Sequence, residues 1–261
     1  MSKIREPAVA GMFYPADENE LRRTVDEFLA AAKPLAVEPK AIVAPHAGYI
    51  YSGAVAASAY KALEKMAGRI RRVVLLGPAH RVAFHGLALS SADYFATPLG
   101  LVPTDKEAAE ALSDLPQVRV FDEAHMLEHS LEVHLPFLQR TLDRFTLVPL
   151  VVGDATAEEV AEVLERLWDG PETLIVVSSD LSHYLDYDTA RRVDQTTRRA
   201  IENLEPEAIG YHDACGRNPV NGLLLAARRH GLEATTVDLR NSGDTAGPRD
   251  QVVGYGAWIF A

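Results

Sequence analysis

Cysteine is almost absent from this 261-residue chain, in which Cys215 is the only one. A single thiol cannot form an internal disulfide, which favours a reducing cytoplasm as the protein's compartment. The chain also lacks the apolar N-terminal segment of a secretory signal, and it has no apolar run of the roughly eighteen residues that span a membrane. These absences predict a cytoplasmic protein with no membrane-spanning segment.

Basic residues are in the minority, because 26 Lys and Arg face 37 Asp and Glu and give a formal net charge of -11. No cluster of Lys and Arg is longer than a pair. This charge balance argues against nucleic acid and anionic membrane surfaces as partners. The sequence also lacks the G-x-S-x-G pattern and the G-x-x-x-x-G-K phosphate loop, so serine-hydrolase and nucleotide-binding functions have none of their usual signals. A small molecule or a peptide is the expected ligand.

What the chain does contain is an alternation of strand-like and helix-like segments. The apolar runs typical of buried parallel strands include residues 41–44, 72–76, 145–152 and 173–177, and the helical patterns include residues 17–33, 52–66, 157–168, 187–203 and 219–230. This alternation predicts an α/β fold, a three-layer αβα sandwich around a mostly parallel sheet. No repeat, low-complexity tract or linker divides the chain. Residues 1–261 are therefore expected to form a single domain.

Four local predictions bear on where a site would lie. The strand, helix and strand over residues 41–76 should place the two strands side by side through a right-handed crossover. Residues 128–142 are expected to form one helix with its leucines on one face, and a helix is expected from Thr104 with Glu107 in a capping box. Residues 5–16 contain two prolines and a glycine and predict an extended segment that docks on the body of the protein.

Three of the apolar runs end in histidine. Residues 41–44 lead into Pro45 and His46, residues 73–76 lead through Gly77-Pro78-Ala79 to His80, and residues 174–177 lead to Asp180 and His183. In open α/β sheets ligands bind just beyond the carboxyl ends of the strands, so the three ends predict one pocket. The prolines restrict the backbone and would present His46 and His80 on stiff loops.

The side chains at these strand ends suit metal binding and proton transfer. Two imidazoles, those of His46 and His80, can bind a transition metal, although loop histidines that cap helices give the same pattern. Asp180 is a candidate for a metal ligand or for the carboxylate that orients an imidazole, and His183 is a candidate acid/base because histidine titrates near neutrality. The alternative is that residues 178–180 only cap the next helix.

Cys215 stands in a tight loop just before a predicted helix. A thiolate near a helix N-terminus is stabilised, which suits a metal ligand or a nucleophile. Buried cysteines without chemical function are also common, so both interpretations of this residue stay open.

The densest cluster of titratable residues lies between Asp122 and Phe137. Within it, residues 125–129 match the H-x-x-E-H pattern of inverted zinc peptidases, which makes a zinc-dependent hydrolase one interpretation. The sequence around the pattern favours a different interpretation. In that interpretation the side chains that point into the pocket, from a helix near its rim, are His129, Glu132 and His134.

Five motifs are specific enough to compare with known families. They are Pro45-His46-Ala47-Gly48-Tyr49 with Tyr51-Ser52-Gly53, Gly77-Pro78-Ala79-His80, Glu128-His129-Ser130-Leu131-Glu132-Val133-His134-Leu135-Pro136, Ser178-Ser179-Asp180-Leu181-Ser182-His183-Tyr184 and Cys215-Gly216-Arg217-Asn218-Pro219. Together with the opening residues 5–14, these motifs make the chain resemble the Memo family over nearly its whole length.

The resemblance implies a fold similar to the class III extradiol ring-cleaving dioxygenases, non-haem iron enzymes that open catechol rings. In those enzymes two histidines and one carboxylate hold Fe(II), and another histidine acts as acid/base. Carried over by motif, the metal ligands of this chain would be His46, His80 and Cys215. A thiolate would thus replace the carboxylate. Thiolate is a softer ligand, so Cu(I) and zinc compete with iron at such a site. Iron or copper is the expected metal, and zinc is the alternative.

The resemblance also assigns residues around the metal. His183 and Asp180 would be the catalytic residues. The pocket residues, taken from the motifs and from the sequence pattern together, would be His129, Glu132, His134 and Tyr49.

Two classes of function follow from the resemblance. The first is a metal-dependent oxidoreductase or dioxygenase-like enzyme of unknown substrate. The second is a non-catalytic binding or adaptor module that retains the pocket, since the family includes eukaryotic members described as signalling adaptors. Microbial members resemble partners of a radical-SAM protein in a shared system, which makes such a protein an expected partner. The acidic chain, with few basic clusters, makes phosphopeptide docking the less favourable function.

Overall fold

The computed structural model describes residues 2–261, which contain twelve strands. Nine of them form the main sheet, and their bounds are β2 (Ala41–Ala44), β3 (Arg72–Pro78), β4 (Leu87–Leu89), β7 (Val118–Val120), β8 (Thr146–Val152), β9 (Thr173–Ser178), β10 (His183–Leu185), β11 (Ala234–Asn241) and β12 (Val252–Phe260). A smaller sheet contains β1 (Ile4–Arg5), β5 (Tyr94–Thr97) and β6 (Gly100–Pro103).

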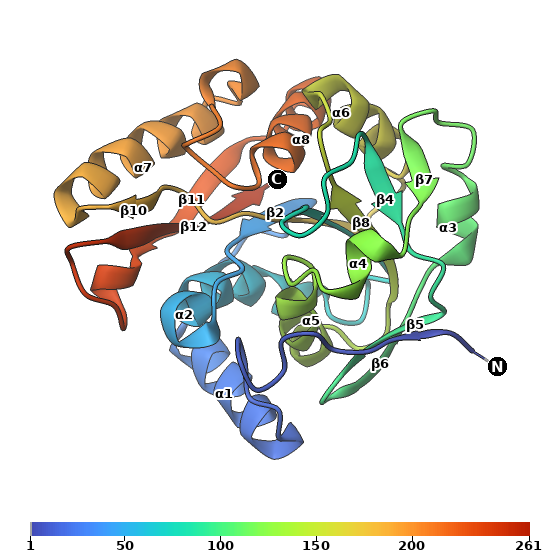
Figure 1. Ribbon diagram of the computed structural model, residues 1–261, viewed down its shortest axis with the longest axis horizontal. Coiled ribbons are helices and arrows are strands. Elements are labelled where there is room, and N and C mark those ends of the chain that lie inside the picture. Colours follow the sequence, from blue (N-terminus) through green and yellow to red (C-terminus); the bar gives the residue numbers. More distant parts are fainter. Residues whose placement is uncertain (1) are drawn as a thin grey trace.

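Helices cover both faces of the main sheet (Figure 1). The α-helices are α1 (Glu18–Ala31), α2 (Tyr49–Tyr60), α3 (Lys106–Glu110), α4 (Glu123–Met126), α5 (Leu135–Thr141), α6 (Ala157–Arg166), α7 (Tyr187–Glu202) and α8 (Arg217–Arg229). The short 3-10 helices are η1 (Lys61–Met66), η2 (Glu132–His134), η3 (Pro206–Ala208) and η4 (Ser242–Asp244). Within residues 2–261, none of the helices combines the length and apolar composition that crossing a bilayer requires.

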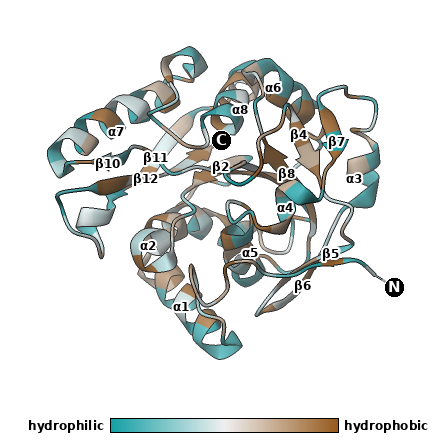
Figure 2. Ribbon diagram, viewed as in Figure 1, coloured by the Kyte–Doolittle hydropathy of each residue, from teal (hydrophilic) through white to brown (hydrophobic). Residues whose placement is uncertain are grey.

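Alternating side chains of the central strands build two apolar cores. In β2, Ile42 and Ala44 pack into the core that α1, α2 and α5 cover, whereas Ala41 and Val43 pack into the core that α6 and α8 cover. This alternation follows from the two-residue period of a strand. Figure 2 shows the apolar central strands and the more hydrophilic α7 at the periphery. The predicted α/β fold is confirmed.

The sheet is mixed, with a parallel centre. Its order is β10-β12-β2-β9-β3-β8-β4-β7, and β11 pairs with β12. The pairs β2–β9, β9–β3 and β3–β8 are parallel, and the pairs β12–β2 and β8–β4 are antiparallel. The carboxyl ends of the four central strands therefore lie at one edge of the sheet.

The prediction that the strands of residues 41–76 are neighbours is wrong, because β9 lies between β2 and β3. Ile175 is paired with Ala41 on one side and with Val74 on the other. Every residue of β9 is buried, which suits a strand with neighbours on both edges and helices on both faces. The loops after β2 and β3 thus flank the loop after β9 instead of each other.

The single helix predicted for residues 128–142 is wrong over its first part. α4 ends at Met126, and residues 127–131 are irregular before η2 and α5 begin. The carboxylate of Glu128 accepts hydrogen bonds from the backbone N–H groups of His129 and Ser130, both at 2.9 Å. A side chain that takes these N–H groups competes with the helical pattern, so the helix cannot start there.

Three helix starts also differ from the predictions. Asp105, not Thr104, caps α3, because its carboxylate accepts the backbone N–H of Ala108 at 2.9 Å. α2 begins at Tyr49, directly after the Pro45 loop, and α8 begins at Arg217. In α8, Pro219, where the prediction placed the helix start, stands in the first turn, a position that tolerates proline.

The N-terminal segment docks on the body as predicted, and Glu132 holds it there. The carboxylate of Glu132 is almost fully buried. It accepts hydrogen bonds from the backbone N–H groups of Ala8 at 2.7 Å and Val9 at 2.9 Å, and from the hydroxyl of Tyr14 at 2.6 Å. The guanidinium of Arg5 forms a buried ion pair with the same carboxylate.

Glu132→Ala should lower the free energy of unfolding by about 3–5 kcal/mol, because removing one partner of a buried ion pair leaves the other charge uncompensated. Urea denaturation measures this loss. Glu6→Ala, an exposed position in the same segment, is the matched control and should change the value by less than about 0.5 kcal/mol. A loss below about 1 kcal/mol for Glu132→Ala would contradict the role of this carboxylate as the anchor.

Candidate metal centre

Three side chains from distant parts of the chain meet at the carboxyl edge of the parallel strands. His46 follows β2, His80 follows β3, and Cys215 precedes α8. The Nε2 atom of His46 lies 3.3 Å from Sγ of Cys215, and one ligand atom from each of the three residues lies within 4.8 Å of the others. The two imidazole rings have centroids 5.1 Å apart. Two imidazoles and one thiol at this spacing can hold a transition metal.

The loop that carries Cys215 lies directly against the end of β9. The backbone N–H of Cys215 donates to the carbonyl oxygen of Asp180 at 3.2 Å, and the N–H of Gly216 donates to Oγ of Ser179 at 3.0 Å. A Cβ atom at Gly216 would lie 2.4 Å from the carbonyl oxygen of Ser178. Glycine is therefore required at this position for the thiol to reach the histidines.

Asp180 fixes the backbone of the loop that presents His46. The backbone N–H of His46 donates to Oδ1 of Asp180 at 2.8 Å, and Oδ2 lies 4.0 Å from Nε2 of the same histidine. Burial raises the pKa of Asp180 to about 6, although the hydrogen bond from His46 opposes the shift. Asp186 caps α7, so residues 178–180 are not the helix cap that the alternative interpretation proposed.

His80 is oriented by Glu128. Its Nδ1 lies 2.9 Å from Oε1 of Glu128, and its backbone N–H donates to Oε2 at 2.6 Å. Burial alone would raise the pKa of Glu128, but hydrogen bonds from His80 and from the backbone lower it to about 2. An ionised carboxylate on Nδ1 leaves Nε2 as the ring nitrogen available to a metal, as in the carboxylate–histidine pairs of known metal sites.

Burial favours the uncharged forms of His46 and Cys215. Burial holds the pKa of His46 well below its usual range, and the neighbouring histidines lower it further. Burial and the nearby Asp180 raise the pKa of the Cys215 thiol. The thiol can then donate a hydrogen bond to Nε2 of His46, and a metal ion would take the place of that proton.

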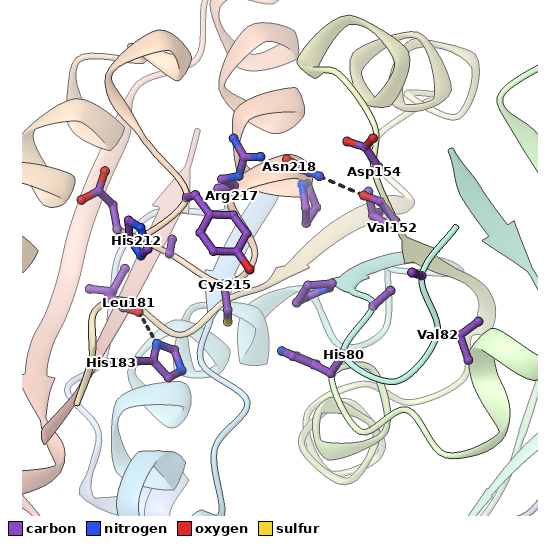
Figure 3. Close-up of a pocket in the computed structure, with 18 of the residues that line it drawn as sticks. His80, Val82, Val152, Asp154, Leu181, His183, His212, Cys215, Arg217 and Asn218 are labelled. Atoms are coloured by element: carbon purple, nitrogen blue, oxygen red, sulfur yellow. Dashed lines mark hydrogen bonds between the residues drawn. The ribbon is translucent and has the colours of Figure 1, made fainter. Parts of the chain in front are cut away.

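A cavity of about 960 Å³ opens beside the cluster. His80, His183 and Cys215 line it, together with apolar side chains such as Val82 and Leu181, and Figure 3 shows the three around one space. Nδ1 of His183 donates to the carbonyl oxygen of Leu181 at 2.8 Å. This bond leaves Nε2 of His183 free to exchange a proton with a bound molecule.

His129 is the one predicted pocket residue that lies beside the cluster. Its ring centroid is 4.7 Å from that of His80 and 5.4 Å from that of His46. Its Nδ1 atom is buried and lies 3.3 Å from Oε1 of Glu128. His80, Glu128 and His129 also offer ligand atoms within 4.8 Å of one another, so the residues present suit a metal.

None of the four predicted pocket residues lines the cavity, and the other three have hydrogen-bond partners inside the protein. Glu132 binds the N-terminal segment, and the hydroxyl of Tyr49 donates to the carbonyl oxygen of Val133 at 2.6 Å. His134 is buried between Tyr60 and Ser178, at 2.8 Å from each hydroxyl. These three predictions need correction, because each side chain is satisfied inside the protein by partners distant in the sequence.

The H-x-x-E-H interpretation is contradicted by the local structure. His125 lies in α4, which ends at Met126, so His125 and His129 do not share a helix face. Nε2 of His125 donates to the carbonyl oxygen of Ala88 at 2.9 Å and its ring packs against Phe95. The zinc-peptidase arrangement is therefore absent from residues 125–129.

Comparison with solved structures shows the fold. The crystal structure of the uncharacterized protein JW3007 from Escherichia coli K12 superposes with a TM-score of 0.53 at 14% sequence identity, covering 82% of this chain and 98% of that one. At this identity the likeness concerns the fold alone.

Comparison with sequences shows the family. A family profile described as Memo-like protein matches residues 5–259. A MEMO1 family protein of Aquifex aeolicus is 40% identical over 99% of both chains, and MEMO1 family protein TV1383 of Thermoplasma volcanium is 34% identical over 98% of both. A MEMO1 family protein of Aeropyrum pernix is 37% identical, over 98% of this chain and 99% of its own. The chain belongs to the Memo-like protein family.

Proposed function

We propose that the protein is a metal-dependent oxidoreductase that acts on a small organic molecule. The observation that carries the proposal is the convergence of His46, His80 and Cys215 at the edge of a cavity large enough for such a molecule. Iron or copper is the proposed metal, because mixed imidazole and thiolate ligands suit both, and zinc is the competitor. When bound, a redox metal would supply the electron transfer that side chains alone do not provide.

The protein's own groups around the centre have separate tasks in this proposal. Glu128 holds the ring of His80, and Asp180 holds the loop of His46. His183 lies across the cavity with Nε2 free, so it would take a proton from a phenolic or similar hydroxyl of the bound molecule and return it later. Apolar side chains on the cavity wall would exclude water from the reacting groups.

The resemblance to class III extradiol dioxygenases supports the same proposal. Their reaction also needs a metal at the edge of an α/β sheet, an open cavity and a histidine that moves a proton. The thiol of Cys215 in place of a carboxylate is the main difference, and it changes the electron density at the metal. We therefore propose the reaction class, oxidation of a small molecule, and leave ring cleavage as one form of it.

The wild-type protein should bind one equivalent of metal when it is purified without chelator and loaded anaerobically with Fe(II). His46→Ala, His80→Ala and Cys215→Ser should each lower metal content to below about a tenth of that value, because three protein ligands are a minimum for such sites. Inductively coupled plasma mass spectrometry measures the metal content. His85→Ala is the matched control, since His85 also lines the cavity but pairs with Asp154 outside the cluster. Equal metal content in all variants would contradict the ligand assignment.

The iron-loaded protein should consume dioxygen with at least one member of a panel of catechols and related phenols. His183→Gln should slow this uptake by about 10²–10⁴-fold, the usual contribution of a positioned acid/base, and leave metal content unchanged. An oxygen electrode and metal analysis measure the two quantities. His212→Gln, another histidine of the cavity wall, is the control and should retain the rate. Stoichiometric metal without uptake for any member of the panel would favour the binding-module function instead.

A further inference from the structure

We infer that Ser178 sets the position of the proton on His46 and thereby aims the bare Nε2 of that ring at the metal centre. Ser178 is the last residue of β9, is paired with Ala44 and is fully buried. Its Oγ lies 2.6 Å from Nδ1 of His46 and 2.8 Å from Nε2 of His134. The same oxygen lies 2.6 Å from the carbonyl oxygen of Ser130. One hydroxyl thus has three close partners.

The hydrogen positions follow from what each partner can donate. A carbonyl oxygen only accepts, so the single hydroxyl proton of Ser178 must point at Ser130. Any other orientation would leave two bare oxygens 2.6 Å apart. Both imidazoles must then donate to Oγ, which has two lone pairs to accept them. His46 therefore carries its proton on Nδ1, and His134 carries its proton on Nε2.

The second half of the network agrees with this assignment. With its proton on Nε2, His134 has a bare Nδ1, which lies 2.8 Å from the hydroxyl of Tyr60. A phenol can donate to that nitrogen. In this buried hydrogen-bond network Tyr60 then donates to His134, His134 donates to Ser178, and Ser178 donates to the carbonyl oxygen of Ser130. Each of these polar atoms has a partner. A buried network with all its members satisfied is rigid, because any rotation leaves a polar group unpaired.

The assignment of the proton on His46 has a consequence for the cluster. A neutral ring with its proton on Nδ1 has a lone pair on Nε2, and that atom faces Sγ of Cys215 at 3.3 Å. The opposite tautomer would place a proton where a metal ligand is needed. Ser178 is thus a positioning residue that acts through His46. Glu128 plays the same part for His80.

The inference deepens the proposed function, since its consequence for metal affinity rests on the metal centre. The tautomers themselves do not depend on the metal centre, because they are properties of the metal-free protein. Long-range nitrogen–proton NMR of metal-free, 15N-labelled wild-type protein identifies the tautomer of each imidazole directly. The expected result is opposite tautomers, with His46 protonated on Nδ1 and His134 protonated on Nε2. His46 protonated on Nε2 alone would overturn the proposal, whatever any variant does.

Two variants test the role of the hydroxyl. Ser178→Ala removes the acceptor of both imidazoles, so His46 should lose its fixed tautomer and Zn²⁺ affinity should fall by about 10–100-fold, the usual effect of losing a partner of a metal-binding histidine. Tyr60→Phe is the matched control, because it removes a hydroxyl from the same hydrogen-bond network but leaves the contact between Ser178 and His46. It should keep the tautomer of His46 and change Zn²⁺ affinity by less than about threefold.

The outcomes separate the two proposals. If Ser178→Ala keeps the wild-type tautomer of His46 and the wild-type Zn²⁺ affinity, the positioning role is wrong. If wild-type protein binds neither Zn²⁺ nor Fe(II) but shows the expected tautomers, the proposed function fails and the assignment of Ser178 stands. If Ser178→Ala does not fold, the tautomers of the wild-type protein alone decide the question.

Discussion

The position of β9 between β2 and β3 is the constraint on which the rest of the structure depends. Parallel pairing on both sides of β9 brings the carboxyl ends of β2, β9 and β3 to one edge of the sheet. Polar residues follow the buried apolar strands there. His46 and His80 come from the flanking strands, and Ser178 and Asp180 stand between them. The Cys215 loop then closes over this edge because Gly216 permits a close approach to Ser178. The candidate metal centre is a consequence of strand order.

Much of this arrangement could be predicted from the sequence. Apolar runs that each end in histidine predict a parallel sheet with polar groups at one edge, and the structure has that edge. Strand order could not be read in the same way, because β2, β9 and β3 are all short apolar runs and no local feature says which one is central. The sequence therefore placed His46 and His80 on adjacent strands, although the pairing of β9 with both separates them.

The polar residues inside the protein were harder to predict, for a physical reason. Glu132, His134 and Glu128 lie in one dense cluster, yet they serve three different purposes: anchoring the N-terminal segment, joining a buried network and orienting His80. Their roles depend on partners more than forty residues away in the chain. Ser178 gave no sequence signal at all, because a serine that caps a helix and a serine that accepts two imidazoles look alike.

We propose that two imidazoles and one thiolate hold a metal at the edge of this sheet. X-ray absorption spectroscopy of the iron-loaded protein tests it most directly, since sulfur and nitrogen ligands are distinguished by their distances and scattering. We expect one sulfur ligand at roughly 2.3 Å together with imidazole ligands, and the loss of the sulfur contribution in Cys215→Ser. A spectrum with only nitrogen and oxygen ligands in the wild-type protein would contradict it.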